Sequence, residues 1–256
     1  MGFASQNSSG NYLLDRIRDE SSSLTQLQID NVKNYFLNLF RNDWALRTYF
    51  RELFPAGSFA KGTAIKGSSD IDLFLSFGMD LPYDLSKLYK AIYDIALKNE
   101  LRPRKQRVSI GISLGSVSVD LVPGKRQSNY TEDHSLHIYR ENTWQKTNVK
   151  EQIRYVLAAQ RTSAIKAFKI WKRDQGLPFP SFLVELTVIK ALQGSRSYTL
   201  EDQCNEVFAY LQNKFESAKI EDPGCISNIV SDDLTQAEKK QIIQAVGRIK
   251  NWTDFI

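Results

Sequence analysis

Three aspartates are the residues of this chain whose type and spacing could do chemistry. Asp70 and Asp72 open the segment SSDIDLFLSF, and Asp120 lies much later in SVSVDLVPG. Side chains alternate along a β-strand, so Asp70 and Asp72 are predicted to project from one face while Ile71 and Leu73 enter the core. Two carboxylates about 7 Å apart on one strand face repel each other at neutral pH unless a cation lies between them.

A hard divalent ion suits such a pair. Mg²⁺ binds through one or two carboxylates and takes its remaining ligands from water and substrate phosphates. If the strand that carries Asp120 lies beside the strand that carries Asp72, three carboxylates converge. Three acids that hold two Mg²⁺ ions, with Mn²⁺ as a substitute, are the arrangement of phosphoryl or nucleotidyl transfer.

A Gly-Ser pair supplies the other half of such a site. Gly57 lets the backbone approach a phosphate closely, and Ser58 offers a hydroxyl donor. A helix that starts near Phe59 would aim free N–H groups at the same anion. Asp-x-Asp alone is most often a solvated strand end, so it is the joint pattern that predicts a phosphate site. Further donors follow at Lys61, Gly62, Thr63 and Lys66.

The elements that must position these residues follow from the hydrophobic pattern. Apolar residues recur at helical spacing over residues 23–54 and again over 82–99. Strands are predicted in SSDIDLFLSF, RVSIGISLGS and SVSVDLVPG. The polar stretch 125–148 indicates a long loop with one short hairpin. Helices are then predicted over residues 149–174, 181–193, 200–218 and 235–252.

The chain therefore divides into two lobes of different composition, and the predicted fold class is α+β. Residues 1–22 are expected to be a flexible terminus and the entry to the long helix. Residues 23–148 are predicted to form a mixed α/β catalytic lobe with a small central sheet, and residues 149–256 an all-helical lobe. A length of 256 residues suits one large domain or two small domains that share a cleft.

Composition and charge exclude several classes of protein. Hydrophobic residues make up 42% of the chain and charged residues 25%, which is typical of a globular protein. No segment has the apolar length of a membrane span, and MGFASQNSSG lacks the features of a signal peptide, so a cytoplasmic protein is expected. The 2 cysteines and 2 histidines are too few for a disulfide framework or a zinc site. A net charge of +5 is compatible with nucleotides or nucleic acid as partners.

The segment GSFAKGTAIKGSSDIDLFLSF resembles the signature of the DNA polymerase β nucleotidyltransferase superfamily, and VSVDLVPG resembles its third-acid strand. This resemblance implies a two-lobed fold in which Asp70, Asp72 and Asp120 are the catalytic, metal-binding residues. It also implies that Gly57 and Ser58 clamp the nucleotide triphosphate. All three acids are present in this chain, with none substituted.

The predicted helical half of the chain narrows the resemblance to one group within this superfamily. AIKAFKIWKRDQGLPFPSFLVELTVIKAL is similar to a segment of the oligoadenylate synthetases, of cyclic GMP-AMP synthase and of their bacterial relatives. By that likeness Lys169 reaches the donor triphosphate, Ser181 touches its phosphates and Phe182 stacks on the donor base. In partial agreement, Lys166, Lys169 and Arg173 share one helix face, predicted as an exposed basic stripe for which an ordinary solvated face is the alternative. The chain lacks a zinc insertion and a long Lys/Arg run for double-stranded RNA, so the resemblance points to a compact bacterial-type relative.

The function implied by this resemblance is the joining of NTPs, ATP among them, into a cyclic or short linear oligonucleotide second messenger in antiviral defence. The alternative is nucleotide addition to an RNA 3′ end, as in CCA-adding or poly(A)-like enzymes, or nucleotidylation of a protein. A catalytically silent nucleotide or RNA sensor is a third hypothesis, against which the three intact acids argue. An RNA acceptor or activator would need a basic track, and the chain has only scattered patches such as RPRKQR at 102–107, which an ordinary solvated face also explains.

The base of the acceptor nucleotide is expected to contact the stretch 125–148. Aromatic side chains stack on any base without a hydrogen-bond code. Aromatic residues that only cover the edge of the core are the alternative. The residues in question are Tyr130, His134, His137, Tyr139 and Trp144.

Overall fold

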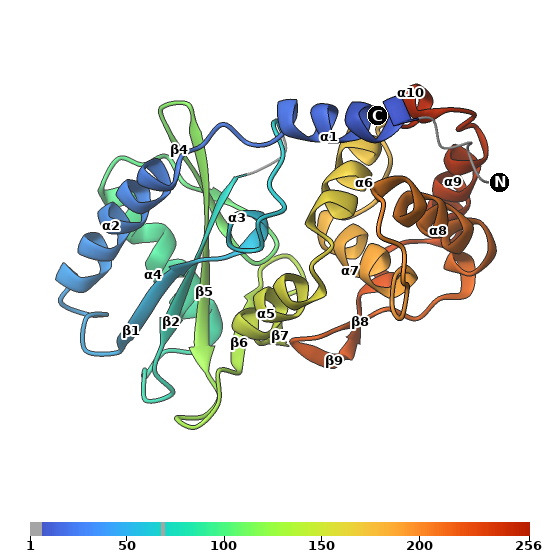
Figure 1. Cartoon of the computed structure of the whole chain (residues 1–256). Coiled ribbons are helices and arrows are strands. Elements are labelled where there is room, and N and C mark those ends of the chain that lie inside the picture. The colour runs from blue at the N-terminus through green and yellow to red at the C-terminus, as the bar shows by residue number, and fades with distance from the viewer. Residues whose placement is uncertain (1–6, 68–69) are drawn as a thin grey trace. The chain divides into compact units, whose positions relative to one another are not determined.

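The computed structural model describes residues 7–67 and 70–256, which pack as two units (Figure 1). Of the described residues, the sheet unit contains 23–61 and 70–153, and the helical unit contains 7–22, 62–67 and 154–256. The chain therefore passes from one unit to the other within α5 (Val149–Ala159), a few residues beyond the expected border after residue 148. The segment after Lys61 belongs to the helical unit, which the sequence did not predict.

The sheet unit is built on a seven-stranded mixed sheet. Its path runs β1 (Phe50–Pro55), β2 (Ile71–Phe77), β5 (Val117–Arg126), β4 (Ile110–Leu114) and β3 (Arg104–Lys105). Off this path, β6 (His134–Ile138) pairs with β5 and with β7 (Thr143–Thr147). β2 and β5 are parallel, whereas the other pairs are antiparallel.

One face of this sheet is buried under α2 (Gln26–Asn42) and α4 (Leu85–Lys98). The two helices begin where side chains cap them, because Thr25 accepts a hydrogen bond from the N–H of Gln28 and Asp84 from that of Lys87. Alternation along the strands then leaves Asp72 and Asp120 on the opposite face of the sheet. The strand residues buried against the helices are Ile71, Leu73, Leu75, Val119 and Leu121.

Two of the predicted helices are wrong in extent. The helix predicted over 23–54 ends at Asn42, because the Asp43 carboxylate accepts hydrogen bonds from the N–H groups of Ala45 and Leu46 and turns the chain. Residues 50–55 then pair with β2 as a strand. The helix predicted over 149–174 is broken at Gln160, whose φ of 53° is left-handed, into α5 and α6 (Thr162–Asp174).

The helical unit encloses a second apolar core. α1 (Asn7–Asp19) buries Leu13 and Ile17 in this core, and Tyr12 donates a hydrogen bond to the carbonyl of Ile256. The expectation of a flexible terminus is therefore wrong for residues 7–19. The other elements of this unit are α7 (Ser181–Ala191), α8 (Leu200–Asn213), η1 (Phe215–Ser217), β8 (Glu221–Asp222), β9 (Cys225–Ile229), η2 (Val230–Asp233), α9 (Gln236–Gly247) and α10 (Trp252–Phe255).

The expected α+β class is confirmed by these two units, one built on a mixed sheet and the other mostly helical. Within the described residues, no helix has both the length and the apolar character needed to cross a bilayer.

Candidate active site

Asp72 and Asp120 are register partners on the parallel strands β2 and β5. Neighbouring strands lie about 4.8 Å apart, so the backbones of the two residues are in direct contact across the sheet. Both side chains project from the face opposite the helices. The expectation that the strand of Asp120 lies beside that of Asp72 is confirmed.

Asp70 lies just before β2 and is exposed, whereas Asp72 and Asp120 are partly buried. The pKa of Asp120 is raised above its usual range, first by burial and then by the negative charge of Asp70. Hydrogen bonds from Gln106 and Ser109 and the charge of Arg104 act in the opposite direction without cancelling that rise. The site therefore concentrates negative charge that a bound cation would relieve.

Two polar residues beside Asp120 were not predicted from the sequence as part of the site. Ser109 Oγ lies 3.4 Å from Asp120 Oδ2, and the same hydroxyl donates to the side chain of Gln106. Gln106 in turn hydrogen-bonds to Asp120. Neither residue belongs to a recognisable motif, and only the alternation of RVSIGISLGS could have hinted that Ser109 faces away from the core.

Gly57 lies directly against the Asp72 carboxylate. Its φ is 57°, and a Cβ built at this position would overlap the Asp72 side chain. The approach is held by the backbone, because the N–H of Ala56 donates to the carbonyl of Asp72 over 2.8 Å. Glycine is required here for both its left-handed conformation and its missing side chain.

Replacing Gly57 by alanine is expected to lower the free energy of unfolding by about 1–3 kcal/mol, because the new side chain adds steric overlap to backbone strain. Urea denaturation measures the change. Gly62→Ala is the matched control, since φ there is 69° but nothing lies within 4 Å of a Cβ. Equal losses in the two variants would mean that the Asp72 carboxylate moves aside without cost.

Ser58 lies in α3 (Gly57–Ala60), a single helical turn beside β2. The expected helix is thus present, but one turn contributes little of the dipole of a long helix. Lys61 ends this turn and is buried. The role predicted for Ser58 and Lys61 in binding phosphates stays a prediction.

Lys169 is not part of an exposed stripe. Its side chain is 1% exposed and its ammonium lies 3.1 Å from the Glu185 carboxylate and 3.3 Å from Thr63 Oγ1. Thr63 Oγ1 also donates to Glu185 over 2.6 Å. The predicted exposure of Lys169 is therefore wrong, since the three residues satisfy one another inside the helical unit. Thr63 and Lys169 as nucleotide-binding residues remain predictions.

The other residues of the predicted stripe also have internal partners. Lys166 donates to Ser21 Oγ over 3.1 Å, and burial lowers the pKa of its ammonium. Arg173 donates to Glu20 and to the carbonyl of Lys66, over 2.8 and 2.9 Å. The stripe is consequently a set of contacts that fasten α6 to neighbouring segments of the helical unit.

Ser181 is contacted by a lysine that the sequence did not single out. Lys172 Nζ donates to Ser181 Oγ and to the carbonyl of Phe179, each over 2.9 Å. Phe182 follows Ser181 at the start of α7 and is only partly buried against the helical core. Ser181 and Phe182 are therefore reachable from solvent, and their roles toward a nucleotide stay predictions.

The aromatic residues of the stretch 125–148 divide into two groups. His134 and His137 are buried in the described structure, and His134 hydrogen-bonds to Ser76 over 2.8 Å. Tyr130, Tyr139 and Trp144 are exposed. The stretch forms the predicted short hairpin, β6 with β7, so the two histidines are core residues and only the other three could meet a base.

The three aspartates fit Mg²⁺ by the chemistry of their oxygen donors and by their mutual repulsion. Their side chains are not drawn together around a common point. Among the residues that the structure describes, no three Asp, Glu, His or Cys side chains form a ready metal-binding group.

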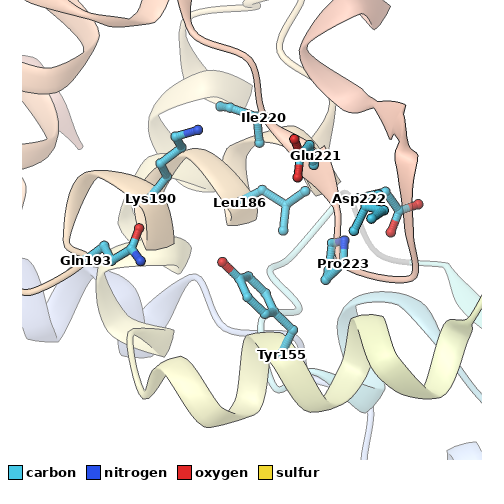
Figure 2. A pocket seen from close by; sticks show the side chains of 9 residues that line it. Tyr155, Leu186, Lys190, Gln193, Ile220, Glu221, Asp222 and Pro223 are labelled. Carbon is cyan, nitrogen blue, oxygen red and sulfur yellow. The ribbon is translucent and has the colours of Figure 1, made fainter.

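A cavity of ≈ 290 Å³ lies in the helical unit and contains none of the predicted site residues (Figure 2). Its floor includes the buried residues Leu186 and Ile220, and Tyr155 projects into it from α5. The remaining lining residues are Lys190, Gln193, Glu221, Asp222, Pro223 and Ile226.

Comparison with known proteins finds a matching family model and a related enzyme. A family model described as a nucleotidyltransferase domain matches residues 45–123, which contain Gly57, Ser58 and all three aspartates. The chain is also 24% identical to the cyclic AMP-AMP-AMP synthase of Escherichia coli (strain MS 115-1) over 233 residues, or 78% of this chain and 68% of that protein.

Two solved structures are similar over nearly the whole chain. E. coli MS115-1 CdnC with ATP is 22% identical with a TM-score of 0.72, covering 92% of this chain and 88% of that chain. The Cid1 poly(U) polymerase bound to MgATP is 12% identical with a TM-score of 0.69, covering 95% of this chain and 93% of that chain. These likenesses confirm the two-lobed polymerase β-like fold.

Proposed function

We propose that the chain, which has the polymerase β-like fold and a match to a nucleotidyltransferase domain over residues 45–123, joins NTPs into a cyclic or short linear oligonucleotide. The observation that carries the proposal is the register of β2 and β5, which makes Asp72 and Asp120 neighbours, together with the contact of Gly57 with Asp72. The similarity to a cyclic AMP-AMP-AMP synthase supports a small cyclic product with ATP among the substrates.

In the proposed reaction a ribose hydroxyl of one nucleotide attacks the α-phosphorus of another. A bond forms between that oxygen and the α-phosphorus, the bond from the α-phosphorus to the bridging oxygen breaks, and pyrophosphate leaves. The hydroxyl proton passes to Asp120 or to solvent.

Asp70, Asp72 and Asp120 would hold Mg²⁺, or Mn²⁺ in its place. When bound, such ions activate the attacking oxygen and neutralise the leaving pyrophosphate. Asp70 contributes the most exposed of the three carboxylates, whereas Asp72 and Asp120 are partly buried. The order of the carboxylates, with Gly57 beside Asp72, supports donor phosphates near Asp72 and the attacking hydroxyl near Asp120.

In the sheet unit, Gly57, Ser58 and Lys61 are proposed to bind the triphosphate of the donor nucleotide. In the helical unit, Ser181, with its partner Lys172, is proposed to bind phosphates, and the accessible ring of Phe182 is proposed to stack on a base. Thr63, Lys166 and Lys169 of the helical unit are proposed to bind nucleotide by exchanging their internal partners for phosphate oxygens.

A role of the product as a second messenger in antiviral defence is part of this proposal, as is a cytoplasmic location where NTPs are available. The support is the similarity to a cyclic nucleotide synthase. The alternative, nucleotide addition to an RNA 3′ end, is favoured by the likeness to the Cid1 poly(U) polymerase. Nucleotidylation of a protein has no such support.

Incubation with all four NTPs and Mg²⁺ or Mn²⁺, with and without added RNA, tests the proposal. We expect phosphatase-resistant oligonucleotides in the absence of RNA, identified by mass spectrometry. A ladder that extends only a supplied RNA would establish the alternative instead. Label transferred from an α-labelled NTP to a protein would refute both.

A further inference from the structure

The basic run RPRKQR at 102–107 resolves into an edge strand of the sheet. Arg104 pairs with Gly111 and Lys105 pairs with Ile110, which is buried against the helices. Paired residues direct their side chains to the same face, and neighbouring residues on a strand to opposite faces. Lys105 therefore faces α4, and Arg104 faces the side of the sheet that carries the aspartates.

The basic residues of the run 102–107 differ in their contacts. The Lys105 ammonium lies over the rings of Tyr93 and Tyr139, at 5.0 and 4.9 Å from their centroids, and donates to the Tyr139 hydroxyl. Arg107 lies 3.8 Å from the Glu141 carboxylate. Arg104 is exposed, and within the described part of the chain no carboxylate lies within 4 Å of its guanidinium.

Arg104 ends a row that crosses four strands. Asp72 on β2 is level with Asp120 on β5, Asp120 with Gly111 on β4, and Gly111 with Arg104 on β3. Two strand spacings, roughly 10 Å, separate the backbones of Asp120 and Arg104.

The position between Asp120 and Arg104 carries no side chain. A Cβ at Gly111 would lie 3.3 Å from Asp120 Oδ1 and 2.6 Å from the Gln106 amide nitrogen. Its absence leaves room for the Gln106 side chain, which hydrogen-bonds to Asp120 on the face of the sheet that also carries Arg104.

We infer that Arg104 binds the 5′-triphosphate of the acceptor nucleotide. The inference rests on the proposed function, in which the donor phosphates lie at Gly57 and Ser58, beside Asp72 at the other end of the row. A nucleotide that presents its ribose hydroxyl at Asp120 carries its phosphates away from the donor, past the Gln106 side chain and toward Arg104. An arginine recognises such phosphates through two parallel charge-assisted hydrogen bonds.

The test compares two acceptors for an α-labelled donor NTP. One acceptor is the α,β-methylene analogue of the acceptor NTP, which keeps its triphosphate charge but cannot itself act as a donor. The other is the corresponding nucleoside. For Arg104→Ala, kcat/KM with the triphosphate acceptor is expected to fall about 10- to 100-fold, with little change for the nucleoside. Arg104→Lys should recover part of the loss.

Arg107→Ala is the matched control, because it removes an exposed arginine of the same run that lies beside the Glu141 carboxylate, and it should leave both acceptors unaffected. An Arg104→Ala variant that loses both acceptors equally, or neither, would overturn the role of Arg104 at the triphosphate. Equal losses would place the arginine at the base or ribose instead. A wild-type protein that joins no nucleotides at all would overturn the proposed function itself.

Discussion

Replacing Asp120 by asparagine is expected to lower the rate of nucleotide joining by about 100- to 1,000-fold while the protein stays folded. Removing one preorganised charged group from an active site has effects of this size. Asp120 is neither a core residue nor part of an ion pair among the described residues, and its backbone pairing with Asp72 and Gly111 does not depend on its side chain. Product formation with Mg²⁺ at saturating NTP measures the loss.

Asp94→Asn is the control for this variant, because Asp94 is an exposed aspartate whose partner is Lys90 on the surface of α4. It should retain wild-type turnover. Wild-type turnover in Asp120→Asn would instead remove Asp120 from the catalytic residues. Asp72→Asn should lower the rate of nucleotide joining by a similar factor, since Asp72 and Asp120 are register partners on neighbouring strands.

The same variant should unfold at a higher temperature than the wild type in metal-free buffer at neutral pH. The pKa of Asp120 is raised by burial and by Asp70, so the ionised carboxylate is less favourable in the folded than in the unfolded protein. The contribution of Asp120 to wild-type stability is then greatest below its unfolded pKa and declines as the pH rises through its folded pKa. The two melting temperatures should converge at acidic pH, and a constant difference would contradict this account.

Replacing Lys169 by methionine is expected to destabilise the protein by about 3–5 kcal/mol, because it leaves Glu185 with an uncompensated buried charge. Lys169 and Glu185 are 1% and 2% exposed and form the buried ion pair of the helical unit. Urea denaturation measures the loss. Lys166→Met removes a lysine of the same face whose contact is a serine hydroxyl, and should cost far less.

A double variant, Lys169→Met with Glu185→Leu, separates packing from charge. Replacing both partners with apolar residues should recover most of the lost stability. A single variant that is as stable as the wild type but has a raised KM for the donor NTP would show that Lys169 serves the substrate and not the fold.

The strands that carry the acids could be predicted because their signal is local. SSDIDLFLSF holds an apolar run of strand length and SVSVDLVPG alternates apolar and polar residues, and the period of two along a strand assigns Asp72 and Asp120 to the face opposite the core. The strand β1 was missed because FRELFP reads equally as the end of an amphipathic helix. Pairing with β2 and the turn at Asp43 make this segment a strand, and both depend on contacts beyond the segment itself.

The lysines of α6 show where local reasoning ends. Helical spacing correctly places Lys166, Lys169 and Arg173 on one face, but spacing does not say what covers that face. Lys169 meets Glu185 from the next helix and Thr63 from a segment more than a hundred residues away in the chain. Its burial therefore could not be read from the sequence of α6.

The sequence by itself predicted the chemistry proposed for this protein: three aspartates, a Gly-Ser pair, and the alternation that turns Asp72 and Asp120 away from the core. Tertiary structure alone decided which of the residues lie beside one another. The register of four strands brings Asp72, Asp120, Gly111 and Arg104 into one row. The physical reason is that side-chain alternation is a property of each strand, whereas register is set by hydrogen bonds and packing between strands that are distant in the chain.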